Sequence, residues 1–114
     1  MTGLSTHVLD TSVGRPAAGV PVVLEVKDAQ GDWKELARAT TDADGRIAQL
    51  LPLGTPLVAA DYRLTFGTAA YFKSRNVEGF YPHVTVVFRV ADARQHFHVP
   101  LLLSPFGYST YRGS

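Results

Sequence analysis

The chain has 114 residues, the usual length of one domain, and its 46% hydrophobic and 18% charged residues are typical of a globular protein. Eleven basic and ten acidic side chains leave a net charge of +1, too small a basic excess for a protein that binds nucleic-acid phosphates. The sequence has no cysteine, which excludes disulfide frameworks, thiolate zinc sites and cysteine nucleophiles. We therefore expect one globular domain over residues 1–114.

The N-terminal residues, from Met1 to His7, have neither the basic start nor the apolar run of a secretion signal. No segment approaches the roughly 18 consecutive apolar residues of a membrane-spanning helix. Together with the absence of cysteine, these features predict a cytoplasmic protein that does not bind membranes.

Most of the chain alternates between apolar and polar residues, which is the period of a half-buried strand. In chain order, this alternation marks residues 4–9, 20–27, 62–66 and 84–90. Turn-forming residues separate such runs, most clearly at 28–32, 42–45 and 91–94. Strands that recur about every 8–12 residues between turns predict an all-β sandwich or barrel.

Residues 68–76 differ because they combine good helix formers with Thr68 as a possible cap, and they predict a short helix of about two turns. The last twenty residues are as apolar and aromatic as the middle of the chain. We therefore expect the C-terminal segment to be built into the fold.

Three of the four histidines are considered for proton chemistry near neutral pH. His7 should lie on the strand face opposite Leu4 and Val8, either as a plain strand histidine bonded to a neighbour or as a working group. His96 and His98 share a strand face about 7 Å apart, a geometry that could hold a metal. A tetrahedral site needs three or four ligands, and no further ligand lies nearby in the sequence. We expect no metal site, with His96 as a solvated edge residue and His98 as a working histidine.

The segment Asp42-Ala43-Asp44-Gly45 is similar to part of a calcium loop, but the glutamate required six residues after the glycine is replaced by Leu51. A plain turn is therefore expected, with Arg46 at the start of a strand. The planar guanidinium of Arg46 could bind a carbonyl or carboxylate group, or could be an ordinary surface charge.

The final residues offer several hydrogen-bonding groups after an apolar, aromatic segment. Tyr111, Arg112 and Ser114 supply donors, and Gly113 allows the backbone to bend or to approach another group closely. Such an end fits either a frayed tail or a segment tucked into a pocket. The sequence contains no Gly-x-Ser-x-Gly elbow, phosphate loop or dinucleotide-binding glycine motif.

Residues 4–17, 41–46 and 96–114 together resemble the 5-hydroxyisourate hydrolase family, the transthyretin-related enzymes of urate breakdown. The most specific match is the closing Tyr-Arg-Gly-Ser, which separates these hydrolases from the transthyretin hormone carriers. The resemblance implies a transthyretin-like eight-stranded β-sandwich with one short helix. It also implies a homotetramer, a dimer of dimers, with active sites where the dimers meet.

The same resemblance implies hydrolysis of 5-hydroxyisourate to 2-oxo-4-hydroxy-4-carboxy-5-ureidoimidazoline, without a metal or cofactor. The implied catalytic residues are His7, Arg46, His98 and Ser114, and the implied substrate-binding residues are His7, Arg46, Tyr111, Arg112 and Gly113. The histidines would activate water and relay protons, and Arg46 would stabilise the developing oxyanion. Ser114 would position His98 or the water through its hydroxyl or a terminal carboxylate.

Two other functions remain open from the sequence. One is a non-enzymatic, transthyretin-type carrier of a small aromatic ligand, although His7, Arg46, His98 and Arg112 would make its channel polar. The other is a β-sandwich interaction module, such as an adhesion or carbohydrate-binding domain.

Overall fold

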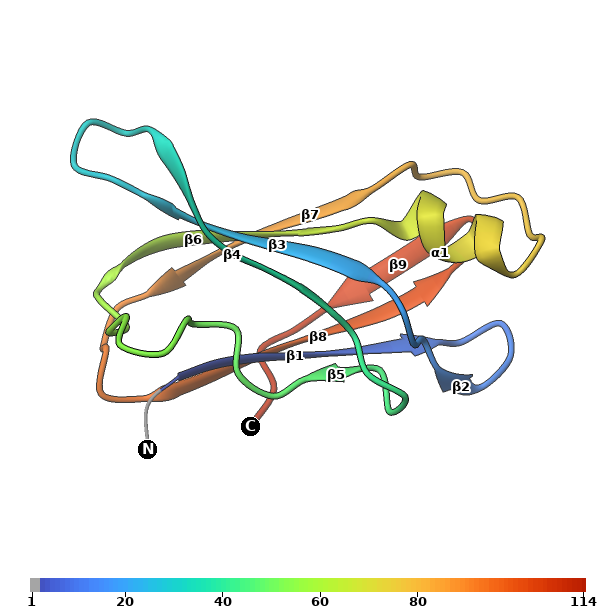
Figure 1. Cartoon of the computed structure of the whole chain (residues 1–114), viewed down its shortest axis with the longest axis horizontal. Coiled ribbons are helices and arrows are strands. Elements are labelled where there is room, and N and C mark those ends of the chain that lie inside the picture. Colours follow the sequence, from blue (N-terminus) through green and yellow to red (C-terminus); the bar gives the residue numbers. More distant parts are fainter. Residues whose placement is uncertain (1–2) are drawn as a thin grey trace.

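The computed structural model describes residues 3–114, which form two β-sheets packed face to face and one short helix at one end (Figure 1). Met1 and Thr2, the start of the segment inspected for a secretion signal, lie outside the described residues. The elements of residues 3–114 are β1 (Gly3–Asp10), β2 (Arg15–Pro16), β3 (Pro21–Lys27), β4 (Trp33–Thr40), β5 (Arg46–Ile47), β6 (Ala60–Phe66), α1 (Thr68–Ser74), β7 (Val84–Val90), β8 (His96–Ser104) and β9 (Gly107–Thr110).

The first sheet has the strand order β2-β1-β8-β9, and β5 also pairs with β1. Strands β1 and β8 run parallel, whereas the other pairs of this sheet are antiparallel. The second sheet has the order β4-β3-β6-β7 and is antiparallel throughout. The predicted all-β sandwich with one helix is confirmed. Residues 3–114 hold nine strands where eight were expected, and two of the nine, β2 and β5, are two-residue segments that pair with β1.

Every second side chain of the main strands enters the core between the sheets, as the alternation predicted. In the second sheet this core face includes Val22, Leu24, Leu64 and Phe66, none of which is more than 1% exposed. In the first sheet it includes the buried side chains of Leu4, Val8, Phe97, Val99, Leu101 and Leu103. The opposite face of each sheet is thereby left for solvent, partners or chemistry.

The expected helix is present as α1, but Thr68 is not its cap. Gly67 occupies the N-cap position, and no side chain of the described residues caps the helix. The Thr68 hydroxyl instead donates to the carbonyl oxygen of Tyr81 at 2.9 Å, because the side chain is buried against that segment. Within residues 3–114, no helix has the length and apolar character to cross a membrane.

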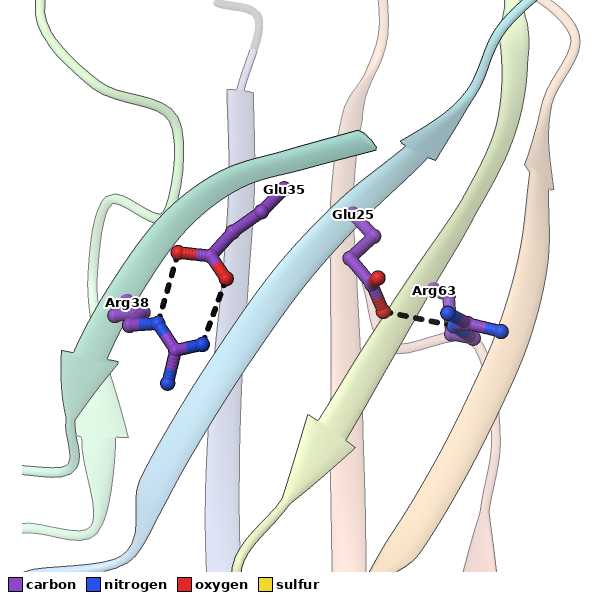
Figure 2. Close-up of polar contacts among 4 residues, drawn as sticks. All are labelled: Glu25, Glu35, Arg38 and Arg63. Atoms are coloured by element: carbon purple, nitrogen blue, oxygen red, sulfur yellow. Dashed lines mark hydrogen bonds and ion pairs between the residues drawn. The ribbon is translucent and has the colours of Figure 1, made fainter. Parts of the chain in front are cut away.

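The outer face of the second sheet carries paired charges. Glu35 accepts two hydrogen bonds from Arg38 at 2.8 Å, and Glu25 accepts one from Arg63 at 2.8 Å (Figure 2). The Arg63 guanidinium also lies 4.4 Å from the ring centroid of Trp33. Ion pairs at a protein surface contribute little to stability. This face is therefore a charged surface.

Candidate active site

Strands β1 and β8 bring two of the predicted site histidines to the same face. Their parallel register places Ser5 opposite His98 and His7 opposite Pro100. Because β1 buries Leu4 and alternate residues in the core, Ser5 and His7 emerge on the outer face of the first sheet. Since directly paired residues share a face, His98 lies on the side that carries Ser5 and His7.

Arg46 reaches this face through β5. It is the direct partner of His7 in the antiparallel β1–β5 pair, where paired Cβ atoms lie about 4.5–5.5 Å apart. The preceding turn positions β5, since Oδ1 of Asp42 accepts the backbone N–H groups of Asp44 and Arg46, each at 2.9 Å. Gly45 has φ +73°, and a Cβ there would collide with the carbonyl oxygen of Val8. The interpretation of residues 42–45 as a plain turn is confirmed.

The C-terminal residues return across β8, as the red end of the chain in Figure 1 shows. The backbone N–H of Gly113 donates to the carbonyl oxygen of His98 at 2.8 Å. A Cβ on Gly113 would lie 2.6 Å from Cδ2 of the His98 ring, so glycine permits a close approach that a larger residue would prevent. The terminal segment thus belongs to the fold, as expected.

These groups surround an open hollow of about 280 Å³ on the outer face of the first sheet. Its lining residues are Ser5, Thr6, Arg46, Ala48, His96, His98 and Ser114. His7 does not line the hollow itself but stands beside it as the strand partner of Arg46. The structure therefore brings together four of the predicted site residues that were spread from residue 7 to residue 114.

Tyr111 and Arg112 do not join this group within one chain. They line a separate, more apolar hollow of about 250 Å³ between β7, β8 and the terminal segment. Nη2 of Arg112 donates to Oε1 of Gln95 at 2.7 Å, and its guanidinium lies 4.4 Å from the ring centroid of Phe97. Both side chains are thus directed away from the hollow that His98 lines.

The surroundings of His98 favour the neutral form of its ring. Partial burial lowers the pKa of His98, and electrostatic interactions with His7, Arg46 and His96 lower that pKa further. A neutral imidazole accepts a hydrogen bond at one ring nitrogen and donates from the other. The site therefore combines a neutral imidazole with a permanently charged guanidinium.

Ser5 is a polar member of this site that the sequence did not single out. Its Oγ lies 2.7 Å from Nδ1 of His98 and 2.9 Å from Nε2 of His96. The expectation that His96 is a solvated edge residue is wrong, because its ring reaches Ser5 and its Nδ1 is buried. Ser5 was recognisable only as a residue two positions from His7 on the same strand face. Within residues 3–114, no group of three or more His, Cys, Asp or Glu side chains could hold a metal.

Comparison with known proteins agrees with this architecture. The sequence model of the HIUase/Transthyretin family matches residues 4–113. The chain belongs to this family. It is 49% identical over 111 residues to the 5-hydroxyisourate hydrolase of Salmonella dublin, an alignment that covers 97% of this chain and 80% of that protein.

Solved structures of both branches of the HIUase/Transthyretin family share the fold. The 5-hydroxyisourate hydrolase of Klebsiella pneumoniae aligns with a TM-score of 0.84 and 41% identity, over 97% of this chain and 98% of that one. Transthyretin from Sparus aurata aligns with a TM-score of 0.89 and 34% identity, over 99% and 97% of the two chains. The transthyretin-like fold and the resemblance to the hydrolases are confirmed, and the residues of the site must distinguish the two branches.

Proposed function

We propose that residues 1–114 form one domain that hydrolyses 5-hydroxyisourate to 2-oxo-4-hydroxy-4-carboxy-5-ureidoimidazoline in urate breakdown. The observation that carries this proposal is the neutral His98 in a hollow with Arg46 and Ser114, next to His7. Relatives that carry the name 5-hydroxyisourate hydrolase over nearly the whole length of this chain support the same conclusion.

The chemistry follows from these groups. Ring opening requires water to attack a carbonyl carbon, so a base must take a proton from that water and an acid must protonate the leaving nitrogen. The imidazoles of His7 and His98 provide proton transfer and hydrogen bonding. The guanidinium of Arg46 stabilises the negative charge that develops on the carbonyl oxygen. Ser114, which lines the hollow, positions His98 or the attacking water.

We further infer that the protein assembles as a homotetramer, a dimer of dimers. Two features support this inference. The hollow is open on the outer face of the first sheet, and β7 and β9 are edge strands that have a neighbour on only one side within residues 3–114. Such edges readily pair with another chain. In this assembly Tyr111 and Arg112 would bind substrate from across an interface, and the molar mass in solution, measured by light scattering, tests it.

A carrier of a small aromatic ligand is the second candidate, because Sparus aurata transthyretin aligns over almost the whole chain. The polar lining of the hollow, with Arg46, His96, His98 and Ser114, disfavours it. A carrier site is expected to bury mostly apolar surface, with only a few polar groups to orient its ligand.

One assay separates the two functions. Urate oxidase generates 5-hydroxyisourate in the cuvette, and its ultraviolet absorbance then decays with or without the protein. The hydrolase accelerates this decay catalytically, whereas a carrier at substoichiometric concentration leaves the spontaneous rate unchanged. The folded His98→Asn variant serves as the control, and its rate should be lower by about 10²–10⁴-fold. A spontaneous rate of decay with the wild-type protein would overturn the proposal.

A further inference from the structure

The hydroxyl of Ser5 lies between two imidazole rings. Ser5 is only 8% exposed, and its Oγ is within hydrogen-bond distance of Nδ1 of His98 and Nε2 of His96. A hydroxyl has one proton, so it donates a hydrogen bond to one of these nitrogens and accepts a hydrogen bond from the N–H of the other. Only two arrangements of the protons are possible between neutral rings, and each fixes the tautomer of both histidines.

The surroundings of His96 decide between these arrangements. Its Nδ1 is buried, and no group within residues 3–114 forms a hydrogen bond with it. A proton on this nitrogen would leave a buried N–H donor without an acceptor, an arrangement that is rare in proteins. The proton of His96 is therefore on Nε2, which donates to Ser5. The Ser5 hydroxyl then donates to Nδ1 of His98, and the proton of His98 is on Nε2.

The backbone holds the His98 ring from a second side. Gly113 approaches the ring so closely that a Cβ would lie 2.6 Å from Cδ2, and its N–H is bonded to the His98 carbonyl oxygen. The ring is thus held between Ser5 and Gly113. Within residues 3–114, no hydrogen bond engages Nε2 of His98, so this N–H is available to a ligand in the hollow.

We propose that Ser5 is a positioning residue, whose hydroxyl links His96 to His98 and holds the His98 ring with its proton on Nε2. The catalytic consequence rests on the proposed hydrolysis. A neutral imidazole that gave up its only N–H proton would become an imidazolate, so His98 acts as a neutral hydrogen-bond donor to the carbonyl oxygen, together with Arg46. His7 is then the base: it takes the proton from water and returns it to the leaving nitrogen, which balances the protons over the cycle.

The tautomer can be measured without substrate. In wild-type protein labelled with ¹⁵N-histidine, at a pH where His98 is neutral, long-range ¹H–¹⁵N spectra distinguish a protonated ring nitrogen from a bare one. The His98 signals are those missing from the His98→Gln variant. The proposal expects a bare Nδ1 and a protonated Nε2 for His98, and a mixture of tautomers in Ser5→Ala. A wild-type His98 with its proton on Nδ1 would overturn it.

Kinetics test the consequence for turnover. Ser5→Ala should lower kcat by about 10–100-fold, the effect of removing a group that orients a reacting one, with a smaller change in KM. Ser5→Thr, which keeps the hydroxyl, should restore most of kcat. Ser109→Ala removes an exposed serine of β9 and should leave kcat unchanged. A folded Ser5→Ala variant with full kcat, or the same loss in Ser5→Thr, would refute the positioning role.

A pair of His98 variants tests the donor role. The side-chain amide of glutamine can place an N–H near the position of Nε2, whereas that of asparagine reaches only the position of Nδ1. His98→Gln should therefore retain at least tenfold more activity than His98→Asn, and equal losses would refute the donor role. If the wild-type protein does not accelerate 5-hydroxyisourate decay at all, the hydrolase proposal fails, while the measured tautomer still decides the role of Ser5.

Discussion

Gly113 and His98 are in contact through both backbone and side chain: the Gly113 N–H donates to the His98 carbonyl oxygen at 2.8 Å, and its α-carbon faces the imidazole ring. The Gly113→Ala substitution places a methyl group 2.6 Å from Cδ2 of His98 and 3.2 Å from Cγ of Pro100. The His98 ring must then shift from the position in which its Nδ1 is bonded to Ser5. Because a displacement of about 1 Å can cost 10²-fold in rate, we expect kcat to fall by about 10–100-fold.

The control for this prediction is stability. Gly113 lies in the terminal segment after β9, so the thermal unfolding midpoint of Gly113→Ala should change little. A variant that keeps full kcat would show that the position of the His98 ring is not important for turnover. A variant whose activity falls only in proportion to its unfolded fraction would also show that the position of the ring does not affect turnover.

Activity should also depend on the charge of His98. Burial lowers its pKa below 6.5, with further lowering by electrostatic interactions with His7, Arg46 and His96. Since the neutral form of His98 is the active one, protonation of this ring should lower kcat/KM as the pH drops through its lowered pKa. The pH dependence of kcat/KM and an NMR titration of His98 check this. A His98 midpoint at or above 6.5 would contradict it.

Arg46 should be required for turnover because its charge lies where the oxyanion forms. Arg46→Gln removes the charge and should lower kcat/KM by about 10²–10³-fold, as expected for the loss of one oxyanion-stabilising group. Arg46→Lys keeps the positive charge without the planar guanidinium, so its kcat/KM should fall by less than that of Arg46→Gln. Arg38→Gln is a matched control, because Arg38 lies on the outer face of the other sheet and pairs with Glu35 (Figure 2). Equal losses from Arg46→Gln and Arg38→Gln would remove Arg46 from the mechanism.

Tyr71 and Asp10 provide a test of stability. The Tyr71 hydroxyl donates to Oδ2 of Asp10 at 2.7 Å and joins α1 to the end of β1. Burial raises the pKa of Tyr71 to about 12, so the hydroxyl remains a donor at any pH of interest. Tyr71→Phe should lower the free energy of unfolding by about 1.5–3 kcal/mol, the usual contribution of a hydrogen bond to a charged group. Urea denaturation at neutral pH measures this, and a change below 0.5 kcal/mol, at about the limit of detection, would contradict it.

Acid should weaken the fold through Asp10. Burial alone would raise the pKa of Asp10, but hydrogen bonds from Ser12 and Tyr71 outweigh it and lower the pKa below 3.8. The folded state therefore binds this proton less readily than the unfolded state. The stabilisation from Asp10 is present above pH 3.8 and is lost as the pH falls through the lowered value. Asp10→Asn should flatten the loss of stability in this range, and an unchanged acid dependence would exclude Asp10 as its source.

The sequence predicted the elements that have a period, and it placed Arg46 at the start of a strand, which β5 confirms, but it did not predict β2. Strands such as β3 and β7 were predictable because alternate residues enter the core. Strands β2 and β5 have two residues each, too few for a period, and exist because β1 offers them a partner. The Thr68 cap was wrong because a tertiary contact takes its hydroxyl.

Within the site, the individual residues were easier to predict than the contacts between them. The residues His7, Arg46, His98 and Ser114 came from a family resemblance, and the structure brings them to one hollow or its border. The contacts of Ser5 were not predictable from spacing, because they join residues 91 and 93 positions apart. They depend on the parallel alignment of β1 with β8, which no local pattern encodes.

That alignment also makes the site sensitive to a slip between two strands. The Thr6 hydroxyl donates to the carbonyl oxygen of Val99 at 2.6 Å inside the protein and so helps to fasten β1 to β8. Because neighbouring strand residues point in opposite directions, a shift of β1 by a single position would turn Ser5 and His7 inward and present hydrocarbon side chains to the substrate. The hydrogen bonds between β1 and β8 thus hold the sandwich together and also keep the reactive groups on the outer face. A shift of one residue in this pairing would disrupt both the packing of the core and the site.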